Sequence, residues 1–290
     1  MADASKKLQT VETVAELRRA VALARGAGEK VGLVPTMGAL HAGHASLISA
    51  SAAECGYTIV TIFVNPTQFA PNEDFKKYPR PLEADLAIAA AHGADLAFVP
   101  AHSEVYPPGF DTYVEMHGVT ETLEGQFRPT HFRGVATVVL KLLLMAGADV
   151  AFLGQKDYQQ TLVVRKLVRD FNVPVEVRVA PTLRDPDGLA MSSRNIFLSP
   201  TERKQALALS RSLRKAQEAV AAGERDMWRV RDILQSVLAA EQGVRVQYAV
   251  VADAETLAEP ARIDRPCVAL VAAFVGSTRL IDNMLLEPAG

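Results

Sequence analysis

Residues 31–44 read Val31-Gly32-Leu33-Val34-Pro35-Thr36-Met37-Gly38-Ala39-Leu40-His41-Ala42-Gly43-His44. The run Val31–Val34 is apolar without alternation, which is typical of a parallel strand covered by helices on both faces. The loop that follows supplies Gly38 and Gly43, where a ligand can approach the backbone, and places His44 near the start of a helix. Because the amides and dipole of a helix N-terminus attract anions, this strand, loop and helix predict a phosphate site on an α/β fold.

Apolar runs of the same kind recur at 58–64, 96–99, 150–153 and 175–179, most of them separated by segments of helical periodicity. This alternation predicts an α/β fold built on a Rossmann-like, doubly wound parallel sheet of about five strands. A first helix is expected to start at the capping box formed by Thr13 and Glu16 and to end near Arg25. Ligands of such sheets bind at the carboxyl ends of the strands.

The pattern changes at residues 181–188, whose Pro and Gly residues disfavour regular structure and suit a domain junction or a mobile loop. We therefore expect one domain over 1–182 and a smaller α+β domain over 183–290. In the smaller domain, helices are expected near 200–222 and 226–241, and strands near 245–252, 267–275 and 279–286. The step Gly276-Ser277 suits a hairpin between the last two strands.

Composition restricts the partners. The chain has 31 Lys and Arg against 33 Asp and Glu, a net charge of −2, so no global field favours nucleic acid or an anionic membrane. Its cysteines, Cys55 and Cys267, lie far apart and outside any metal motif, which predicts two small buried hydrophobes in a reducing compartment. The first residues lack the apolar core of a signal peptide, and no stretch approaches the roughly 20 apolar residues of a membrane span. We expect a cytoplasmic protein.

A second candidate site is the segment Gly154-Gln155-Lys156-Asp157, which follows a predicted strand. Gly154 permits close approach of a ligand, Lys156 can pair with phosphate, and Asp157 can accept from a ribose hydroxyl. Gln160 projects one turn further along. The alternative is that Asp157 is a helix N-cap and Lys156 an ordinary exposed cation.

A third candidate site is Gly188-Leu189-Ala190-Met191-Ser192-Ser193-Arg194-Asn195, which combines two hydroxyls and an arginine in a flexible segment able to close over a triphosphate. A solvated linker is the alternative.

His41 and His44 of the first segment could both donate to phosphate oxygens and stabilise charge on departing pyrophosphate. Their alternatives are a polar cap on a surface turn and half of a metal site.

The three sites together resemble the nucleotidylyltransferase superfamily, whose HIGH-like and KMSKS-like elements hold ATP from two sides. Within it, five segments resemble the pantothenate synthetase family: residues 35–44, 64–69, 128–134, 156–160 and 187–195. They occur in one order over roughly residues 31–200.

The resemblance implies a ligase that condenses pantoate with β-alanine on the route to coenzyme A, using ATP and Mg²⁺. The pantoate carboxylate attacks the α-phosphorus, pyrophosphate leaves, and β-alanine then attacks the pantoyl adenylate and releases AMP. The resemblance also implies a homodimer. It makes 1–182 the ATP- and pantoate-binding domain and 183–290 a lid.

The resemblance also implies roles for single residues. His44, His41 and Lys156 would be catalytic. Gln68 and Gln160 would bind pantoate, with Gln68 also on β-alanine. The residues that would bind ATP are Met37, Gly38, Ala39, Leu40, His41, Ala42, Gly43, His44, Gly154, Gln155, Lys156, Asp157, Leu183, Met191, Ser192, Ser193 and Arg194.

One departure from the family pattern matters: Gln155 stands where a Glu is usual, and we expect a changed nucleotide affinity and no loss of activity. Arg128, His131 and Arg133 could guide anionic substrates or be the solvated charges of a loop. Asp85 could assist the metal, but Mg²⁺ commonly keeps water and phosphate ligands, so no protein ligand is assigned to it.

Two other functions stay open at this point. An adenylyltransferase would use the same histidine loop and stop without an amine, although Gln68 and Gln160 argue against it. A nucleotide sensor without catalysis would bind ATP without turnover, although His44 and Lys156 are both present.

Overall fold

The computed structural model describes residues 7–70 and 74–288 and divides them into two compact units. Of these described residues, unit 1 takes 7–70, 74–154 and 159–181, and unit 2 takes 155–158 and 182–288. The sequence did not indicate that residues 155–158, which carry Lys156, pack with the C-terminal part of the chain.

Unit 1 contains a six-stranded sheet in the order β1-β4-β3-β2-β5-β6, and every pair in it is parallel. The strands are β1 (Gln9–Val11), β2 (Val31–Thr36), β3 (Tyr57–Ile62), β4 (Leu96–Phe98), β5 (Val150–Gly154) and β6 (Glu176–Ala180). The helices are α1 (Val14–Gly26), α2 (Ala42–Glu54), α3 (Leu82–Ala91), α4 (His102–Val105), α5 (Glu124–Phe127), α6 (His131–Ala146) and α7 (Tyr158–Asp170).

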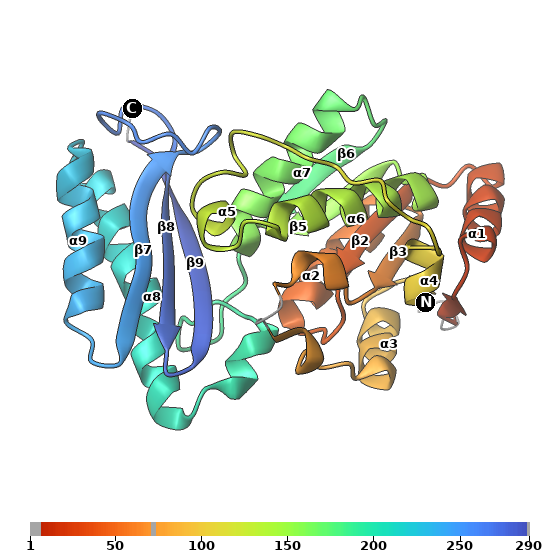
Figure 1. Cartoon of the computed structure of the whole chain (residues 1–290), viewed down its shortest axis with the longest axis horizontal. Helices are drawn as coiled ribbons and strands as arrows, with labels where there is room; N and C mark the ends of the chain where they lie inside the picture. Colours follow the sequence, from red (N-terminus) through yellow and green to blue (C-terminus); the bar gives the residue numbers. More distant parts are fainter. Residues whose placement is uncertain (1–6, 71–73, 289–290) are drawn as a thin grey trace. The chain divides into compact units, whose positions relative to one another are not determined.

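Helices lie on both sides of this sheet (Figure 1). Leu33 and Val34 of β2 belong to different cores, because successive side chains of a strand point to opposite faces. Leu33 packs in the core that contains residues of α1, α6 and α7, whereas Val34 packs in the core that contains residues of α2 and α3. The predicted doubly wound sheet is confirmed, and its strand order reverses between β2 and β5.

The expectation of five strands missed β1. This strand has three residues at the edge of the sheet, pairs with β4, and buries Val11 alone. A pattern this short carries no periodicity that a sequence can reveal. The predicted first helix is confirmed, since Thr13 and Glu16 form the capping box at the start of α1.

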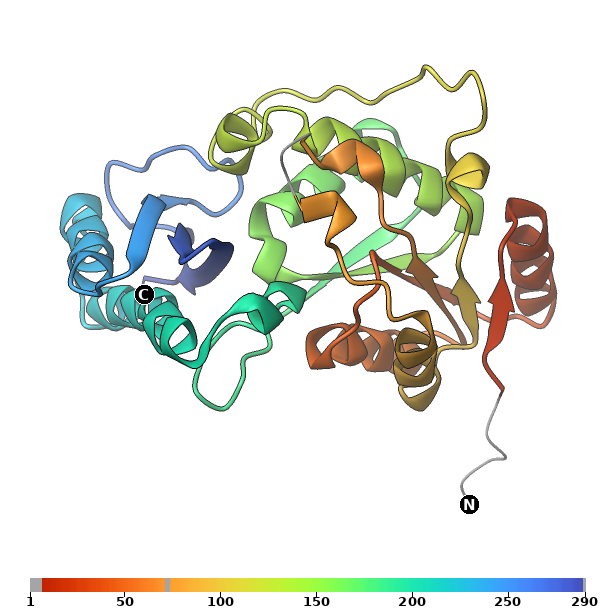
Figure 2. The same cartoon turned by 60° about the horizontal axis from the view of Figure 1, so that its bottom comes forward.

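Unit 2 contains the antiparallel sheet β7-β8-β9, and α8 and α9 lie against the same side of it (Figure 2). Its elements are α8 (Pro200–Ala221), α9 (Met227–Ala239), β7 (Val244–Asp253), β8 (Cys267–Val275) and β9 (Thr278–Leu286). Val275 pairs with Thr278 across the predicted hairpin, and Gly276 has the positive φ (56°) that such a turn favours. The two cysteines are buried and free, as predicted. Within the described ranges, none of the helices is both long and apolar enough to cross a membrane.

Candidate functional site

The loop after β2 is held in shape by a buried carboxylate from α3. Asp85, which is 1% exposed, accepts hydrogen bonds from the backbone N–H groups of Ala39 (2.9 Å) and Leu40 (2.7 Å). Gly38 and Ala39 have φ of 83° and 51°, and this left-handed geometry is unfavourable for alanine. Burial raises the pKa of Asp85 more than the two hydrogen bonds lower it. Because backbone amides already engage both oxygens, Asp85 is better suited to supporting this turn than to binding a metal.

His41 and His44 cap the first turn of α2 reciprocally. The N–H of His41 donates to Nδ1 of His44 (3.3 Å), and the N–H of Gly43 donates to Nδ1 of His41 (3.1 Å). A ring nitrogen that accepts carries no proton, so each neutral ring holds its proton on Nε2. The ring centroids lie 4.2 Å apart. In both rings at the start of α2, the donor is therefore Nε2–H.

This geometry bears on the two alternatives for the histidines. The polar cap is present. It uses only Nδ1 of each ring, and Nε2 carries the proton, so the cap is compatible with anion binding. A shared metal site is less well supported, because backbone donors engage both Nδ1 atoms. Among the described residues, no group of three His, Cys, Asp or Glu side chains is placed to hold a metal ion.

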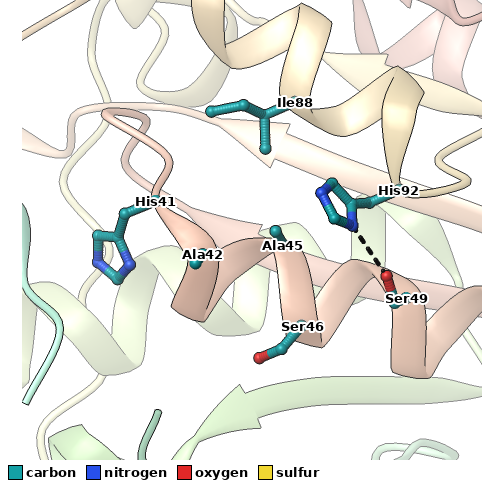
Figure 3. Close-up of a pocket in the computed structure, with 7 residues that line it drawn as sticks. All are labelled: His41, Ala42, Ala45, Ser46, Ser49, Ile88 and His92. Atoms are coloured by element: carbon teal, nitrogen blue, oxygen red, sulfur yellow. Dashed lines mark hydrogen bonds between the residues drawn. The ribbon is translucent and has the colours of Figure 1, made fainter. Parts of the chain in front are cut away.

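A pocket of about 550 Å³ lies beside His41 (Figure 3). Ala42, Ala45, Ser46 and Ser49 of α2 line it together with His41, and Ile88 and His92 come from α3 and its C-cap. The small side chains of Ala42 and Ala45 leave this face of α2 open. A ligand that reaches His41 therefore has room for more than a phosphate group.

Gln68 is buried at the end of the 3₁₀ helix Pro66–Gln68, with 8% of its surface exposed. Its Oε1 accepts from Nδ2 of Asn65 (3.0 Å), and its Nε2 donates to Sδ of Met37 (3.1 Å). The structure thus brings a predicted pantoate residue against the predicted ATP loop. An amide held this way can both donate to and accept from a ligand that carries hydroxyls and a carboxylate.

Two of the three candidate anion guides contact the backbone of Gln68. Arg128 Nη2 donates to the Gln68 carbonyl (3.3 Å), and Nδ1 of His131 lies 3.0 Å from the same oxygen. His131 is buried, and only 15% of the Arg128 side chain is exposed, so neither is a solvated loop charge. Arg133 differs, because it is 45% exposed, lies 3.4 Å from Glu115 and stacks on the ring of Tyr113.

The two adjacent glutamines of α7 have different surroundings. Gln159 is buried and anchors the neighbouring loop, with its Nε2 donating to the carbonyls of Val119 (2.7 Å) and Thr122 (2.8 Å). Gln160 is half-buried in the same unit as Gln68. No hydrogen bond joins Gln160 to Gln68 among the described residues.

The second candidate site lies at the end of β5 and in the segment that follows. Gly154 ends β5, which pairs with β2 in the sheet of unit 1. Gln155–Asp157 form one 3₁₀ turn, which belongs to unit 2. The Lys156 side chain is only 19% exposed, with Nζ 3.6 Å from Asp157 Oδ1, so it is not an ordinary exposed cation.

The third candidate site is an ordered loop. The N–H of Met191 donates to the carbonyl of Leu183 (3.0 Å), and Ser192 Oγ accepts from the N–H of Arg194 (3.3 Å) to cap the 3₁₀ helix Ser193–Phe197. Arg203 of α8 donates to the carboxylates of Asp185 (2.6 Å) and Asp187 (2.9 Å). These bonds make the segment more than a solvated linker.

Sequence reasoning assigned no role to two asparagines. Asn65, which is 1% exposed, lies within the family-like segment 64–69, and its Oδ1 accepts from the hydroxyl of Tyr106 (2.8 Å). Its place before a proline was the one available signal, since it is typical of a turn. Asn283, which is 2% exposed, contacts the Lys156 segment from β9, and nothing local in the sequence indicates that contact.

Comparisons with known proteins point to one family over nearly the whole chain. The profile of the family described as pantoate–β-alanine ligase matches residues 9–285. The pantothenate synthetase of Roseiflexus sp. is 50% identical over 280 residues, which cover 97% of this chain and 100% of the relative. The pantothenate synthetase of Moorella thermoacetica is 48% identical, covering 97% of this chain and 99% of the relative.

Solved structures share the fold. The pantothenate synthetase of Thermus thermophilus superposes with a TM-score of 0.92 at 43% identity, covering 97% of this chain and 100% of that chain. The pantoate–β-alanine ligase of Francisella tularensis, solved in complex with beta-gamma ATP and β-alanine, gives a TM-score of 0.78 at 34% identity, covering 97% and 99%. The chain therefore belongs to the pantoate–β-alanine ligase family.

Proposed function

We propose that this chain makes pantothenate from pantoate, β-alanine and ATP in two steps. A carboxylate oxygen of pantoate bonds to the α-phosphorus of ATP, and the bond from that phosphorus to pyrophosphate breaks. The neutral amine of β-alanine then bonds to the acyl carbon of pantoyl adenylate, AMP departs with the electron pair, and the amine proton goes to solvent. The work of the protein is alignment and charge stabilisation.

The observation that carries this proposal is the reciprocal histidine cap on α2. It leaves Nε2 as the protonated ring nitrogen of His41 and of His44 at a helix N-terminus, where such donors would stabilise departing pyrophosphate. We assign the loop from Met37 to Gly43 to the same nucleotide. Asp85 supports that assignment, since it holds the turn at Ala39 in one conformation.

Further ATP contacts are assigned to the segments of the second and third candidate sites. Lys156 and Ser192–Arg194 would bind phosphate, Gly154, Gln155 and Asp157 would meet adenosine, and backbone groups of Leu183 and Met191 would meet adenine. Thr182 Oγ1 and Asn195 Oδ1, which flank that loop, are buried without a partner among the described residues. A base or its bound water would supply the donors that such atoms need.

Pantoate is assigned to Gln68 and Gln160, and β-alanine to Gln68. Support comes from the Gln68 amide, which is buried and oriented by Asn65 and therefore suited to a ligand that carries hydroxyls. ATP would enter as its Mg²⁺ complex, with the ion held by phosphates and water, because the described residues offer no cluster for it. We also propose a cytoplasmic homodimer.

The test is pantoate-dependent release of pyrophosphate from ATP, with and without β-alanine, followed by analysis of the products. We expect AMP and an amide in equal amounts when all three substrates are present. AMP attached to a nucleotide or to phosphopantetheine, without an amide, would favour an adenylyltransferase. ATP binding without any turnover would favour a sensor.

A further inference from the structure

Strand β9 carries two neighbouring polar residues that are almost completely buried. Asp282 is 3% exposed and Asn283 is 2% exposed. Successive side chains of a strand point to opposite faces, so the two can reach different segments. Because burial of a polar group is costly unless it is hydrogen-bonded, their partners show what the pair does.

Asn283 holds the backbone of the segment that carries Lys156. Its Nδ2 donates to the carbonyl of Gln155 (3.0 Å) and to the carbonyl of Lys156 (2.8 Å). Its Oδ1 accepts from Nε2 of Gln155 (3.3 Å). One side chain thus fixes two successive peptide groups at the lysine, and all three contacts lie within unit 2.

Asp282 holds the loop that leads to Met191. Its two oxygens accept from Nη1 (2.6 Å) and Nη2 (3.0 Å) of Arg184, a bidentate pair in which both side chains are largely buried. Arg184 also donates to the carbonyl of Gly188 (3.3 Å), and its backbone forms a bridge with Ala190. The charge pair therefore fixes the base of the loop.

We propose that Asn283 is a positioning residue for the ATP-dependent step and acts by fixing the backbone of Lys156. Asp282 supports it, because Asp282 Oδ1 accepts from the N–H of Asn283 (2.8 Å) and its partner Arg184 donates to the Asn283 carbonyl (3.4 Å). This inference rests on the proposed function. A lysine stabilises charge at a reacting phosphate only if it is held in place beforehand, since misplacement by about 1 Å can cost about 100-fold in rate. Asn283 supplies that restraint from a residue 127 positions away in sequence.

The experiment measures pantoate-dependent exchange of labelled pyrophosphate into ATP in the full chain. Asn283→Ala should lower the exchange about 10- to 100-fold, whereas Lys156→Ala should lower it at least about 100-fold. The matched control is Gln217→Ala, because Gln217 Nε2 also donates to a β9 carbonyl, that of Leu285 (3.0 Å), but from the surface of α8. This control should keep the wild-type rate.

A double variant separates positioning from general structural damage. If Asn283 acts through Lys156, adding Asn283→Ala to Lys156→Ala should change the exchange by less than about threefold. The inference would be overturned if Asn283→Ala had the same effect in the wild-type and Lys156→Ala backgrounds. It would also be overturned if the folded fraction of Asn283→Ala exchanged pyrophosphate at the wild-type rate.

If Asn283→Ala does not fold, Asn283→Ser is the substitute, because its hydroxyl can donate to one of the two carbonyls and should give an intermediate rate. A wild-type chain that shows no exchange at all would instead reject the proposed function.

Discussion

At the scale of residues, this site depends on groups that hold other groups in place. His41 and His44 each use Nδ1 to accept from the backbone, which orients both rings and fixes the tautomer that donates through Nε2. Asp85 does the same for the turn before them by accepting from two amides. Charge stabilisation of a leaving group works best when the donors are already oriented, so the cost of ordering them is met in folding.

The first prediction concerns His44. His44→Ala should lower pantoate-dependent pyrophosphate exchange by about 100-fold, because the leaving pyrophosphate loses an oriented donor. The reaction of pre-formed pantoyl adenylate with β-alanine should fall much less. The control is His117→Ala, which removes an exposed histidine that is paired with Glu121 (2.9 Å) and does not line the pocket beside His41. Normal exchange with a blocked second step would instead make His44 a base for the amine.

The second prediction concerns the support of the Ala39 turn. In Asp85→Asn, the remaining side-chain oxygen can accept from only one of the N–H groups of Ala39 and Leu40. The new NH₂ group is a donor and faces the other N–H, so that hydrogen bond is lost. Loss of one buried hydrogen bond, about 1.4 kcal/mol, should raise the KM for ATP roughly tenfold and leave pantoate binding nearly unchanged. Glu83→Gln, in the same first turn of α3, is the control for charge. An unchanged KM for ATP would show that Asp85 has no part in shaping the loop.

The third prediction follows from the raised pKa of Asp85. Because the folded pKa lies above the ordinary 3.8, the folded chain keeps a proton that the unfolded chain has released. The contribution of this carboxyl to the free energy of unfolding is therefore complete below pH 3.8 and is lost as pH rises through the folded pKa. Urea unfolding should show that the free energy of unfolding of the wild type, minus that of Asp85→Asn, becomes smaller as pH rises from 3.8 through the folded pKa. A difference that is independent of pH would contradict the raised pKa.

At the scale of elements, the sequence predicts well what periodicity and local capping determine. The long helix α8 and the hairpin between β8 and β9 have patterns that local chemistry decides. The edge strand β1 was missed because three residues carry no pattern. Local sequence also cannot show which strand will hold a loop, so the contact of Asn283 with Lys156 and that of Asp85 with Leu40, 45 residues apart, appear only in the folded chain.

The fourth prediction concerns the packing of α6 against the 3₁₀ helix that carries Gln68. A Cβ at Gly134 would lie 2.4 Å from the Thr67 carbonyl oxygen and 2.6 Å from the Gln68 nitrogen, and neither backbone atom can move cheaply. Gly134→Ala should therefore cost about 1–3 kcal/mol of stability and displace Gln68. Calorimetric titration should show pantoate affinity falling more than ATP affinity.

The control for this packing is Gly26→Ala, because a Cβ at Gly26 meets nothing within 4 Å and the residue ends α1. Its stability should stay within about 0.5 kcal/mol of the wild type. If Gly134→Ala instead weakened ATP and pantoate equally, the pantoate site would not lie at Gln68.

At the scale of the whole molecule, the predicted roles are divided between two units with separate cores. The histidine loop and Gln68 belong to unit 1, whereas Lys156, Leu183 and the segment 191–194 belong to unit 2. The full-length match to the family shows that relatives carry both parts. In the proposed function, the C-terminal unit is a lid that binds only part of the nucleotide. Such a division is useful for catalysis, because binding of the substrate can then complete the site.

The last prediction tests whether one nucleotide engages both units. Hydrogen exchange, followed by mass spectrometry, should show that a non-hydrolysable ATP analogue with Mg²⁺ slows exchange in residues 37–44 and also in 155–157 and 183–194. Amides that donate to a ligand, or that lie in segments it orders, open less often and exchange more slowly. Pantoate alone should slow residues 65–69 and 158–161 and leave 183–194 unchanged, which is the internal control. Protection confined to unit 1 would remove Lys156 and Ser192–Arg194 from the nucleotide site and would leave the C-terminal unit without a role as a lid.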